Sequence, residues 1–199
     1  MKNKIIMLLV VCVVLCSTGC KKTAPMSKQL TKVFEDYHFS TTISTVNLDS
    51  SGYYSTQTPP KVIHQPSTAV VDYIGASKRI PEKAVINIAY ADYNKEQDAQ
   101  NVYEIEKEKI VSKTKESGTD FITDNLVIGI YVPEFGNNDN ICLFFLLYKS
   151  NTAIVYINEQ GPISYVEENK ALIIDICKTV GFDPTETINE LINDSKALF

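Results

Sequence analysis

The chain has 199 residues, of which 44% are hydrophobic and 10% aromatic, and this composition excludes a disordered stalk because it provides enough apolar side chains for a folded core. Its 24 acidic residues outnumber its 19 basic ones, giving a formal charge of −5. Such a balance disfavours nucleic acid, whose binding depends on basic side chains that neutralise phosphates, and it is repelled by anionic lipid headgroups.

Residues 1–19 have the pattern of an export signal. Lys2 and Lys4 precede an unbroken apolar run at residues 5–16, which small residues follow. The run is too short for a transmembrane helix, which needs about 20 residues. The next residues, Ser-Thr-Gly and then Cys20, resemble the lipobox of bacterial lipoproteins, although an aliphatic residue usually stands in place of the serine. The resemblance implies cleavage before Cys20 and lipidation of its thiol, and the alternative is an ordinary secreted protein cut after a small residue.

This N-terminal pattern predicts the organisation of the whole chain. We expect a lipoprotein signal peptide at residues 1–19, a lipidated Cys20 with a tether at residues 20–27, and a single domain at residues 28–199. Without residues 1–19 the formal charge becomes −7, from 17 basic and 24 acidic residues. The domain is then expected on the outer face of the cell membrane, held there through its lipid.

Two segments follow the tether in chain order. Apolar residues at helical spacing predict an amphipathic helix from Ser27 to Tyr37. Alternating Thr, Ile and Val residues then favour a strand at residues 39–46. Turn residues predominate in residues 49–66, which predicts a loop.

The next pattern predicts two strands and a long helix. The first strand covers residues 69–74 and is expected to end at Gly75 and Arg79, and the second covers residues 84–90. A helix opened by Asp92 or Asn94 continues until Gly118 stops it. Glu106 lies within the apolar stripe of this helix, and we interpret it as a side chain that reaches solvent at the edge of the stripe rather than as a functional carboxylate.

Three closely spaced strands are predicted at residues 125–132, 140–148 and 152–158. Short polar turns separate them, which favours an antiparallel meander. The middle strand is apolar at every position from Ile141 to Leu147, so both of its faces need cover. Helices supply one cover, and the other comes from the N-terminal strands, a partner, a ligand or another copy of the chain.

Two helices are predicted to close the chain. Ser164 and Glu167 have the spacing of a capping box, and Gly181 with the following phenylalanine is typical of a left-handed C-terminal cap. Asp183 and Pro184 then mark the cap and first residue of the last helix. The expected fold is α+β, with a mainly antiparallel sheet, made of the meander and N-terminal strands, packed against three to four helices.

One long segment of the chain carries a further similarity. It runs from residues 91–107 (ADYNKEQDAQNVYEIEK) through residues 153–182 (AIVYINEQGPISYVEENKALIIDICKTVGF). This half of the chain resembles the small uncharacterised lipoproteins of Gram-positive bacteria. In them a strand, an acidic helix and a strand meander lead to a helix that ends in Gly and an aromatic residue. The resemblance implies no activity.

The sequence predicts no catalytic, cofactor or metal site. His38 and His64 are the only histidines, and the motifs of serine hydrolases, zinc proteases and nucleotide-binding proteins are absent. Cys142 and Cys177 stand in apolar contexts and are expected to be buried core thiols, with a disulfide as the alternative. Carboxylate pairs permit acid–base chemistry or Ca²⁺ binding, and the candidate pairs are Asp120 with Asp124 and Asp92 with Glu96.

A binding function is the main expectation. The chain has 11 tyrosines and no tryptophan, and tyrosine suits contacts with sugars and proteins. The tyrosines expected in or beside loops are Tyr53, Tyr54, Tyr73, Tyr90 and Tyr93. The alternative is that strand tyrosines only form cross-strand pairs, as at Tyr131, Tyr148 and Tyr156. We therefore expect a membrane-anchored, non-enzymatic binding or interaction module with a cell-surface protein or glycan partner. The alternative is a cell-envelope hydrolase that uses acidic residues.

Overall fold

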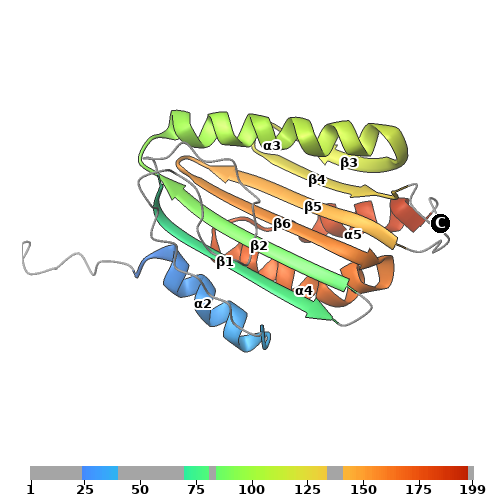
Figure 1. Ribbon diagram of the computed structural model, residues 1–199, viewed down its shortest axis with the longest axis horizontal. Helices are drawn as coiled ribbons and strands as arrows, with labels where there is room; N and C mark the ends of the chain where they lie inside the picture. Colours follow the sequence, from blue (N-terminus) through green and yellow to red (C-terminus); the bar gives the residue numbers. More distant parts are fainter. Residues whose placement is uncertain (1–23, 40–69, 81–83, 134–140, 197–199) are drawn as a thin grey trace, which may run out of the picture.

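The computed structural model describes residues 24–39, 70–80, 84–133 and 141–196. Within these ranges the chain forms one six-stranded antiparallel sheet with helices packed against it (Figure 1), which confirms the predicted α+β class. The elements in chain order are α2 (Met26–Asp36), β1 (Val70–Ile80), β2 (Ala84–Tyr93), α3 (Glu96–Ser117), β3 (Gly118–Ile122), β4 (Leu126–Tyr131), β5 (Ile141–Ser150), β6 (Ala153–Pro162), α4 (Ile163–Thr179) and α5 (Thr185–Ser195).

The strand order is β1-β2-β6-β5-β4-β3. β1 and β2 form one antiparallel hairpin, and β3 to β6 form a meander, so the predicted pairing of the last three strands is confirmed. The two units join where β6 pairs with β2, with Ile157 opposite Ile88. This pairing places residues about 70 positions apart in the sequence side by side in the centre of the sheet.

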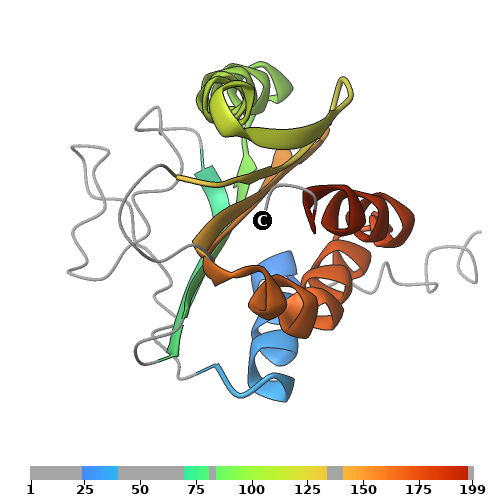
Figure 2. The same ribbon diagram turned by 90° about the vertical axis from the view of Figure 1, so that its right-hand side faces the viewer.

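The helices divide between the two faces of the sheet. Figure 2 shows α2, α4 and α5 together on one side, with α3 set apart from them. One buried cluster joins the sheet to α2, α4 and α5, and a second joins the opposite face to α3. Each face of the sheet therefore has its own apolar core.

The doubly apolar strand is β5, and the two cores explain it. Phe144 and Leu146 point to the α4 side, while Phe145 and Leu147 point to the α3 side. All four are 3% exposed or less. Both faces of β5 are thus covered by helices of the same chain. The expectation that N-terminal strands, a partner, a ligand or a second copy covers one face is wrong.

The N-terminal elements follow the prediction in part. α2 begins and ends one residue earlier than predicted. Phe39, the first residue of the predicted strand, is buried against Phe34 with ring centroids 5.6 Å apart. The rest of that strand and the predicted loop at residues 49–66 lie outside the described residues. β1 does not end at Gly75 but continues to Ile80, because β2 pairs with it along that whole length.

Neither end of α3 forms for the reason that was predicted. The helix starts after Lys95 without a side-chain cap, and Asp92 belongs to β2 instead. Gly118 does end the helix, but its φ of −153° is extended and it begins β3, a strand that the sequence analysis missed. A Cβ at Gly118 would lie 2.4 Å from the carbonyl oxygen of Ile130, so glycine is required here by close backbone approach.

The predicted capping box of α4 is wrong, whereas its C-terminal cap is confirmed. Ser164 lies inside the first turn, after Pro162 at the cap position, and makes no capping hydrogen bond. At the other end Gly181 has a φ of +90°. The N–H groups of Phe182 and Gly181 donate to the carbonyls of Cys177 and Lys178 at 2.9 and 3.0 Å, which is the Schellman pattern.

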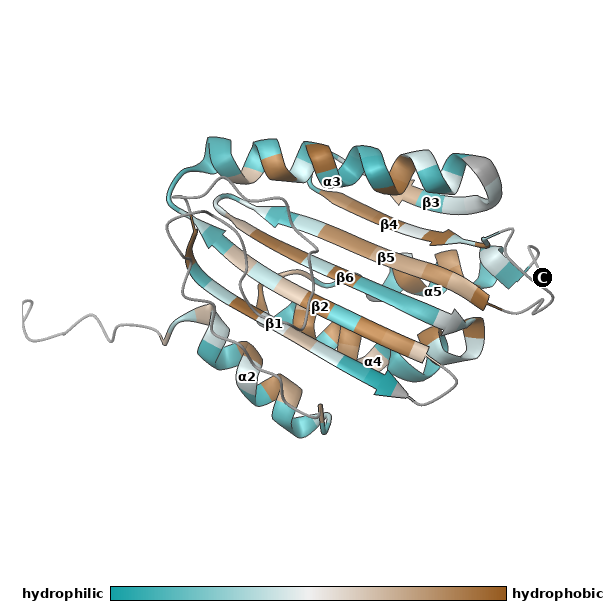
Figure 3. Cartoon of the chain, in the orientation of Figure 1, coloured by the Kyte–Doolittle hydropathy of each residue, from teal (hydrophilic) through white to brown (hydrophobic). Residues whose placement is uncertain are grey.

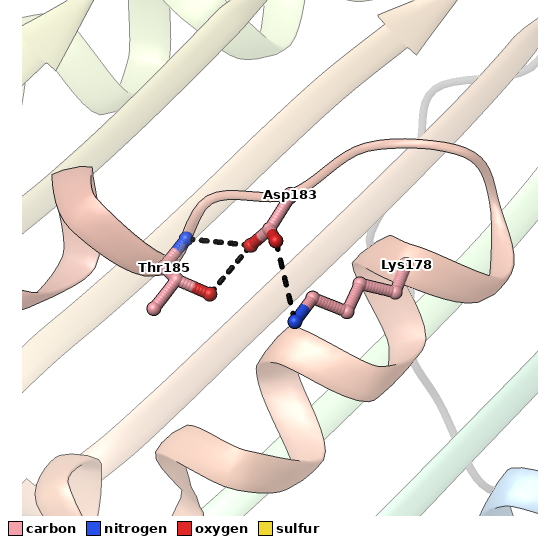
Figure 4. A network of polar contacts seen from close by, with 3 residues as sticks. All are labelled: Lys178, Asp183 and Thr185. Carbon is pink, nitrogen blue, oxygen red and sulfur yellow. Dashed lines mark hydrogen bonds and ion pairs between the residues drawn. The ribbon is translucent and has the colours of Figure 1, made fainter.

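Asp183, the predicted N-cap of α5, lies one residue before the cap position, in the connection from α4 (Figure 4). Oδ1 of Asp183 accepts hydrogen bonds from the backbone N–H of Thr185 at 3.0 Å and from its hydroxyl at 2.5 Å. Oδ2 lies 3.2 Å from Nζ of Lys178. The Thr185 hydrogen bonds, with help from Lys178, lower the pKa of Asp183. The helix starts one residue later than predicted, with Pro184 at the cap position.

Candidate functional site

Cys20, the predicted lipidation site, lies outside the described residues. The first described residue, Ala24, is only four positions later, and its carbonyl accepts a hydrogen bond from the Gln29 side chain at 2.9 Å. The N–H of Ser27 donates to Oδ2 of Asp72 at 3.0 Å. The start of α2 is therefore fixed to the start of β1.

The tyrosines expected at a surface are mostly in the cores. The exposed fractions of Tyr73, Tyr90 and Tyr93 are 8%, 5% and 1%. The expectation that they form a ligand-contacting surface is therefore wrong. Tyr53 and Tyr54 lie outside the described residues. The cross-strand alternative holds for Tyr156, which is buried between Ala89 and Leu147 on its two neighbouring strands.

The predicted carboxylate pairs have separate structural partners. Asp92 accepts from the Thr152 hydroxyl at 2.7 Å, and Asp120 accepts from the Thr114 hydroxyl at 2.5 Å. Glu96 lies 3.7 Å from Nζ of Lys149. Asp124 is exposed. Across the described ranges, no three His, Cys, Asp or Glu side chains are grouped so as to hold a metal ion.

Both predicted core thiols are in one core. Cys142 on β5 and Cys177 on α4 are unpaired, 0% exposed and part of the cluster on the α4 side of the sheet. Burial raises the pKa of each thiol to about 12. The prediction of buried reduced thiols is confirmed, and a thiol with such a raised pKa is a poor nucleophile at neutral pH.

One of the two histidines lies within the described residues. His38 follows α2, is exposed and has a φ of +51°. His64 lies outside the described residues.

Glu106 is buried, contrary to the prediction that it reaches solvent. It is 4% exposed between α3 and the sheet, and its Oε1 accepts from Nζ of Lys109 at 2.7 Å. The pKa of nearby Tyr156 is raised first by burial and then by the charge of Glu106. The hydroxyl of Tyr93 is buried without a hydrogen-bond partner in the part of the chain that the structure describes. Glu106 is thus part of a buried polar group under α3.

Glu159 is a second buried carboxylate, and the sequence analysis missed it. It lies on β6 facing α4 and is 0% exposed. Nδ2 of Asn169 donates to its Oε1 at 2.7 Å, and its Oε2 has no partner among the described residues. Burial raises its pKa to about 7, with a smaller contribution from Glu168. The alternation Val155, Ile157, Glu159 is a signal that could have revealed it, but the predicted strand ended at residue 158.

A further polar arrangement is a row of side chains across three strands. Ser77 on β1 is in register with Asn87 on β2, which is in register with Asn158 on β6. In the next row Arg79 and Gln160 both flank Val85. Because side chains alternate along a strand, all these residues share the face that carries α3. We call the five polar residues Ser77, Arg79, Asn87, Asn158 and Gln160 the polar shelf.

The polar shelf is partly exposed at one end of the sheet. Arg79 and Gln160 are exposed, and Ser77, Asn87 and Asn158 are half-buried. α3 lies along β3, β4 and β5 (Figure 1). Nζ of its Lys113 lies over the ring of Phe145, which is in register with the shelf residue Asn158, so α3 borders the shelf here. Figure 3 shows hydrophilic colour on the shelf end of β6 and in the middle of β2.

The shelf residues suit hydrogen bonding rather than acid–base chemistry. The Ser77 hydroxyl donates to Oδ1 of Asn87 at 2.9 Å, which fixes the amide and directs its Nδ2 group elsewhere. Neighbouring strands place such groups about 4.8 Å apart, a spacing that suits several polar atoms of one ligand. Arg79 adds a fork of five donors at the rim. Hydroxyl, amide and guanidinium groups keep one protonation state near neutral pH.

Comparisons with known proteins add no family to this geometry. A scan against protein-family models finds no match to the chain, and a search of curated proteins finds no significantly similar sequence. None of the helices within the described ranges combines the length and the apolar composition that a membrane-spanning helix requires.

Proposed function

We propose that the protein is a lipid-anchored, extracytoplasmic, non-enzymatic binding module that holds a polar partner on the polar shelf. The anchor is Cys20, for which the positively charged start, apolar run and small residues of the N-terminal segment provide the support. The partner is a cell-surface glycan or protein. The cell membrane is its location, with the domain on the outer face.

The cross-strand row of Ser77, Asn87 and Asn158 carries the binding part of this proposal. These side chains stand on rigid strands, lie in one row and are only half-buried, so reaching them does not require any described element to unfold. Amides and hydroxyls pair with sugar hydroxyls and with peptide groups, which are neutral donors and acceptors. This chemistry defines the class of partner.

The alternative, a cell-envelope hydrolase that uses acidic residues, has weaker support. Asp92 and Asp120 each accept a hydrogen bond from a threonine hydroxyl of the fold. The carboxylate with a pKa near neutrality, Glu159, is 0% exposed beneath α4 and cannot reach a substrate. A general acid or base needs hydrogen-bond reach to its substrate.

Binding to the shelf is testable with residues 21–199 as a soluble protein. Retention on purified cell-wall glycan and on surface-protein extracts is compared for wild type and an Asn87→Ala, Asn158→Ala double variant. At about 1 kcal/mol for each lost hydrogen bond, the double variant should bind at least tenfold more weakly. Asn101→Ala and Asn193→Ala, both on exposed helix surfaces, form the matched control and should bind like wild type.

Equal retention of the wild type and the shelf variant, with unchanged thermal unfolding, would exclude the shelf as the binding site. Release of sugar or peptide fragments, lost on mutating one acidic pair, would instead establish the hydrolase.

A further inference from the structure

We infer that one defined end of the sheet meets the lipid surface, and that the polar shelf is directed away from it. The end consists of the start of β1, the connection from β2 to α3, and the β5–β6 turn, with the β3–β4 turn beside them. This inference rests on the proposed lipidation of Cys20 and adds to it the orientation in which the domain is presented.

The chain between the anchor and the fold is very short. Ala24 is four residues from Cys20, and a fully extended chain of that length spans at most about 14 Å. Residues 24–29 are tied together, since the N–H of Lys28 donates to the carbonyl of Pro25 at 3.0 Å. The lipid therefore limits how far the first turn of α2, and the part of the sheet beside it, can lie from the membrane.

That part is the start of β1, and hydrogen bonds join it to the neighbouring turns. The N–H of Ser27 donates to Asp72, and Val70 pairs with Tyr93 at the end of β2. The N–H of Tyr93 then donates to the carbonyl of Thr152 in the β5–β6 turn at 2.9 Å. The first turn of α2 is thus connected rigidly to three strands.

The connections extend to the rest of that end. The N–H of Lys149 donates to the carbonyl of Asn125 in the β3–β4 turn at 2.9 Å, and its Nζ lies 3.7 Å from Glu96 at the start of α3. Figure 1 shows the start of α2, the end of β2 and the start of α3 at the same end of the sheet. They form one surface, the tether end, rather than separate flexible parts.

The tether end carries groups that tolerate a lipid surface. Val71 is 59% exposed, which makes it the most exposed of the large apolar side chains within the described ranges. Lys28 in the first turn of α2 and Lys95 before α3 are exposed at this end, but so are Glu96 and Asp124, so charge alone does not favour its contact with anionic headgroups.

The polar shelf lies toward the other end of the same strands. At about 3.3 Å per residue, Ser77 and Arg79 are roughly 17 and 23 Å beyond Asp72 along β1. Their register with Asn87 and Gln160 places the shelf on β2 and β6 at the same height. A domain standing on its tether end therefore presents the shelf to the extracytoplasmic space, where a surface glycan or protein can reach it.

Energy transfer from labelled cysteines to labelled lipids measures this orientation. Lys95→Cys reports on the tether end and Gln160→Cys on the shelf, and both positions are exposed. Selective labelling is possible because Cys142 and Cys177 are buried. The lipidated full chain is placed on vesicles of phosphatidylcholine and phosphatidylglycerol with acceptors in the outer headgroup layer. We expect clearly stronger transfer from position 95 than from position 160.

An insertion of about 20 Gly and Ser residues after Cys20 is the matched control, because a flexible chain of that length should remove the difference between positions. Equal transfer at both positions of the uninserted chain, or stronger transfer at position 160, would overturn the orientation while leaving the anchor intact. Absence of vesicle association would reject the lipid anchor itself and the orientation with it. The two failures are therefore distinguishable.

Discussion

Asn169 on α4 donates a hydrogen bond to Glu159 on β6 at 2.7 Å, and this contact leaves the second carboxylate oxygen of Glu159 without a partner among the described residues. The pair joins the last long helix to a central strand inside an otherwise apolar cluster. Burial penalises the charged carboxylate, and Glu168 adds repulsion, while the Asn169 hydrogen bond opposes both. The resulting pKa of about 7 makes the stability of the fold depend on pH.

The first prediction concerns stability as a function of pH. The folded chain holds the Glu159 proton more tightly than the unfolded chain, whose carboxyl has the ordinary pKa of 4.5. The stabilising effect of protonation is complete below that value and is lost as pH rises to about 7. In urea unfolding, the free energy of unfolding of the wild type should fall by on the order of 3 kcal/mol between pH 5 and pH 8. The Glu159→Gln variant should not show this fall.

Glu190→Gln, an exposed change on α5, controls for the loss of one negative charge. Glu168 and the thiol of Cys142 are the other titratable groups that interact with Glu159, and a pKa of about 12 keeps the thiol protonated throughout this window. An identical fall in stability from pH 5 to pH 8 in wild type and Glu159→Gln would refute the assignment.

The second prediction concerns the two cysteines. Both thiols are 0% exposed and burial raises their pKa values, so a maleimide should label neither in the native protein on the timescale of minutes. Denaturation should expose both, with or without a reductant. Rapid native labelling would contradict the burial, and thiols that appear only after reduction would establish a disulfide.

The third prediction ranks two glycine substitutions. At Gly118 a Cβ would meet backbone atoms of Ile130 and Thr114 at 2.4 and 3.0 Å, and backbone cannot easily move aside. Gly118→Ala should therefore cost about 2–4 kcal/mol of unfolding free energy. At Gly181 a Cβ meets nothing within 4 Å, so only the left-handed φ of +90° is strained and Gly181→Ala should cost about 1–2 kcal/mol. Thermal or urea unfolding measures both, and a reversed order would contradict the packing at Gly118.

Elements with strong local patterns were predictable from the sequence. The helical spacing of Leu30 and Phe34 located α2, and Gly181 with Phe182 located the end of α4. The meander was predictable because its turns are short and polar. β3 was missed because it is five residues long, largely exposed and begins directly at the glycine that ends α3.

The features that depend on distant contacts were not predictable. Glu106 is buried because the sheet covers its position on α3, and no local pattern gives that depth. The polar shelf exists because β6 pairs with β2, which brings Asn158 beside Asn87 from 71 residues away. The capping box at Ser164 was a coincidence of spacing, since β6 continues to Pro162 and the helix follows without a loop.

The central claim is that Cys20 anchors the domain to a membrane, and mass spectrometry of the mature N-terminus in its native cell tests it most directly. The account predicts a chain that begins at Cys20 with a diacylglyceryl group on its sulfur, and a Cys20→Ala variant that leaves the membrane fraction. An unmodified N-terminus at another residue, or membrane association unchanged in Cys20→Ala, would contradict it.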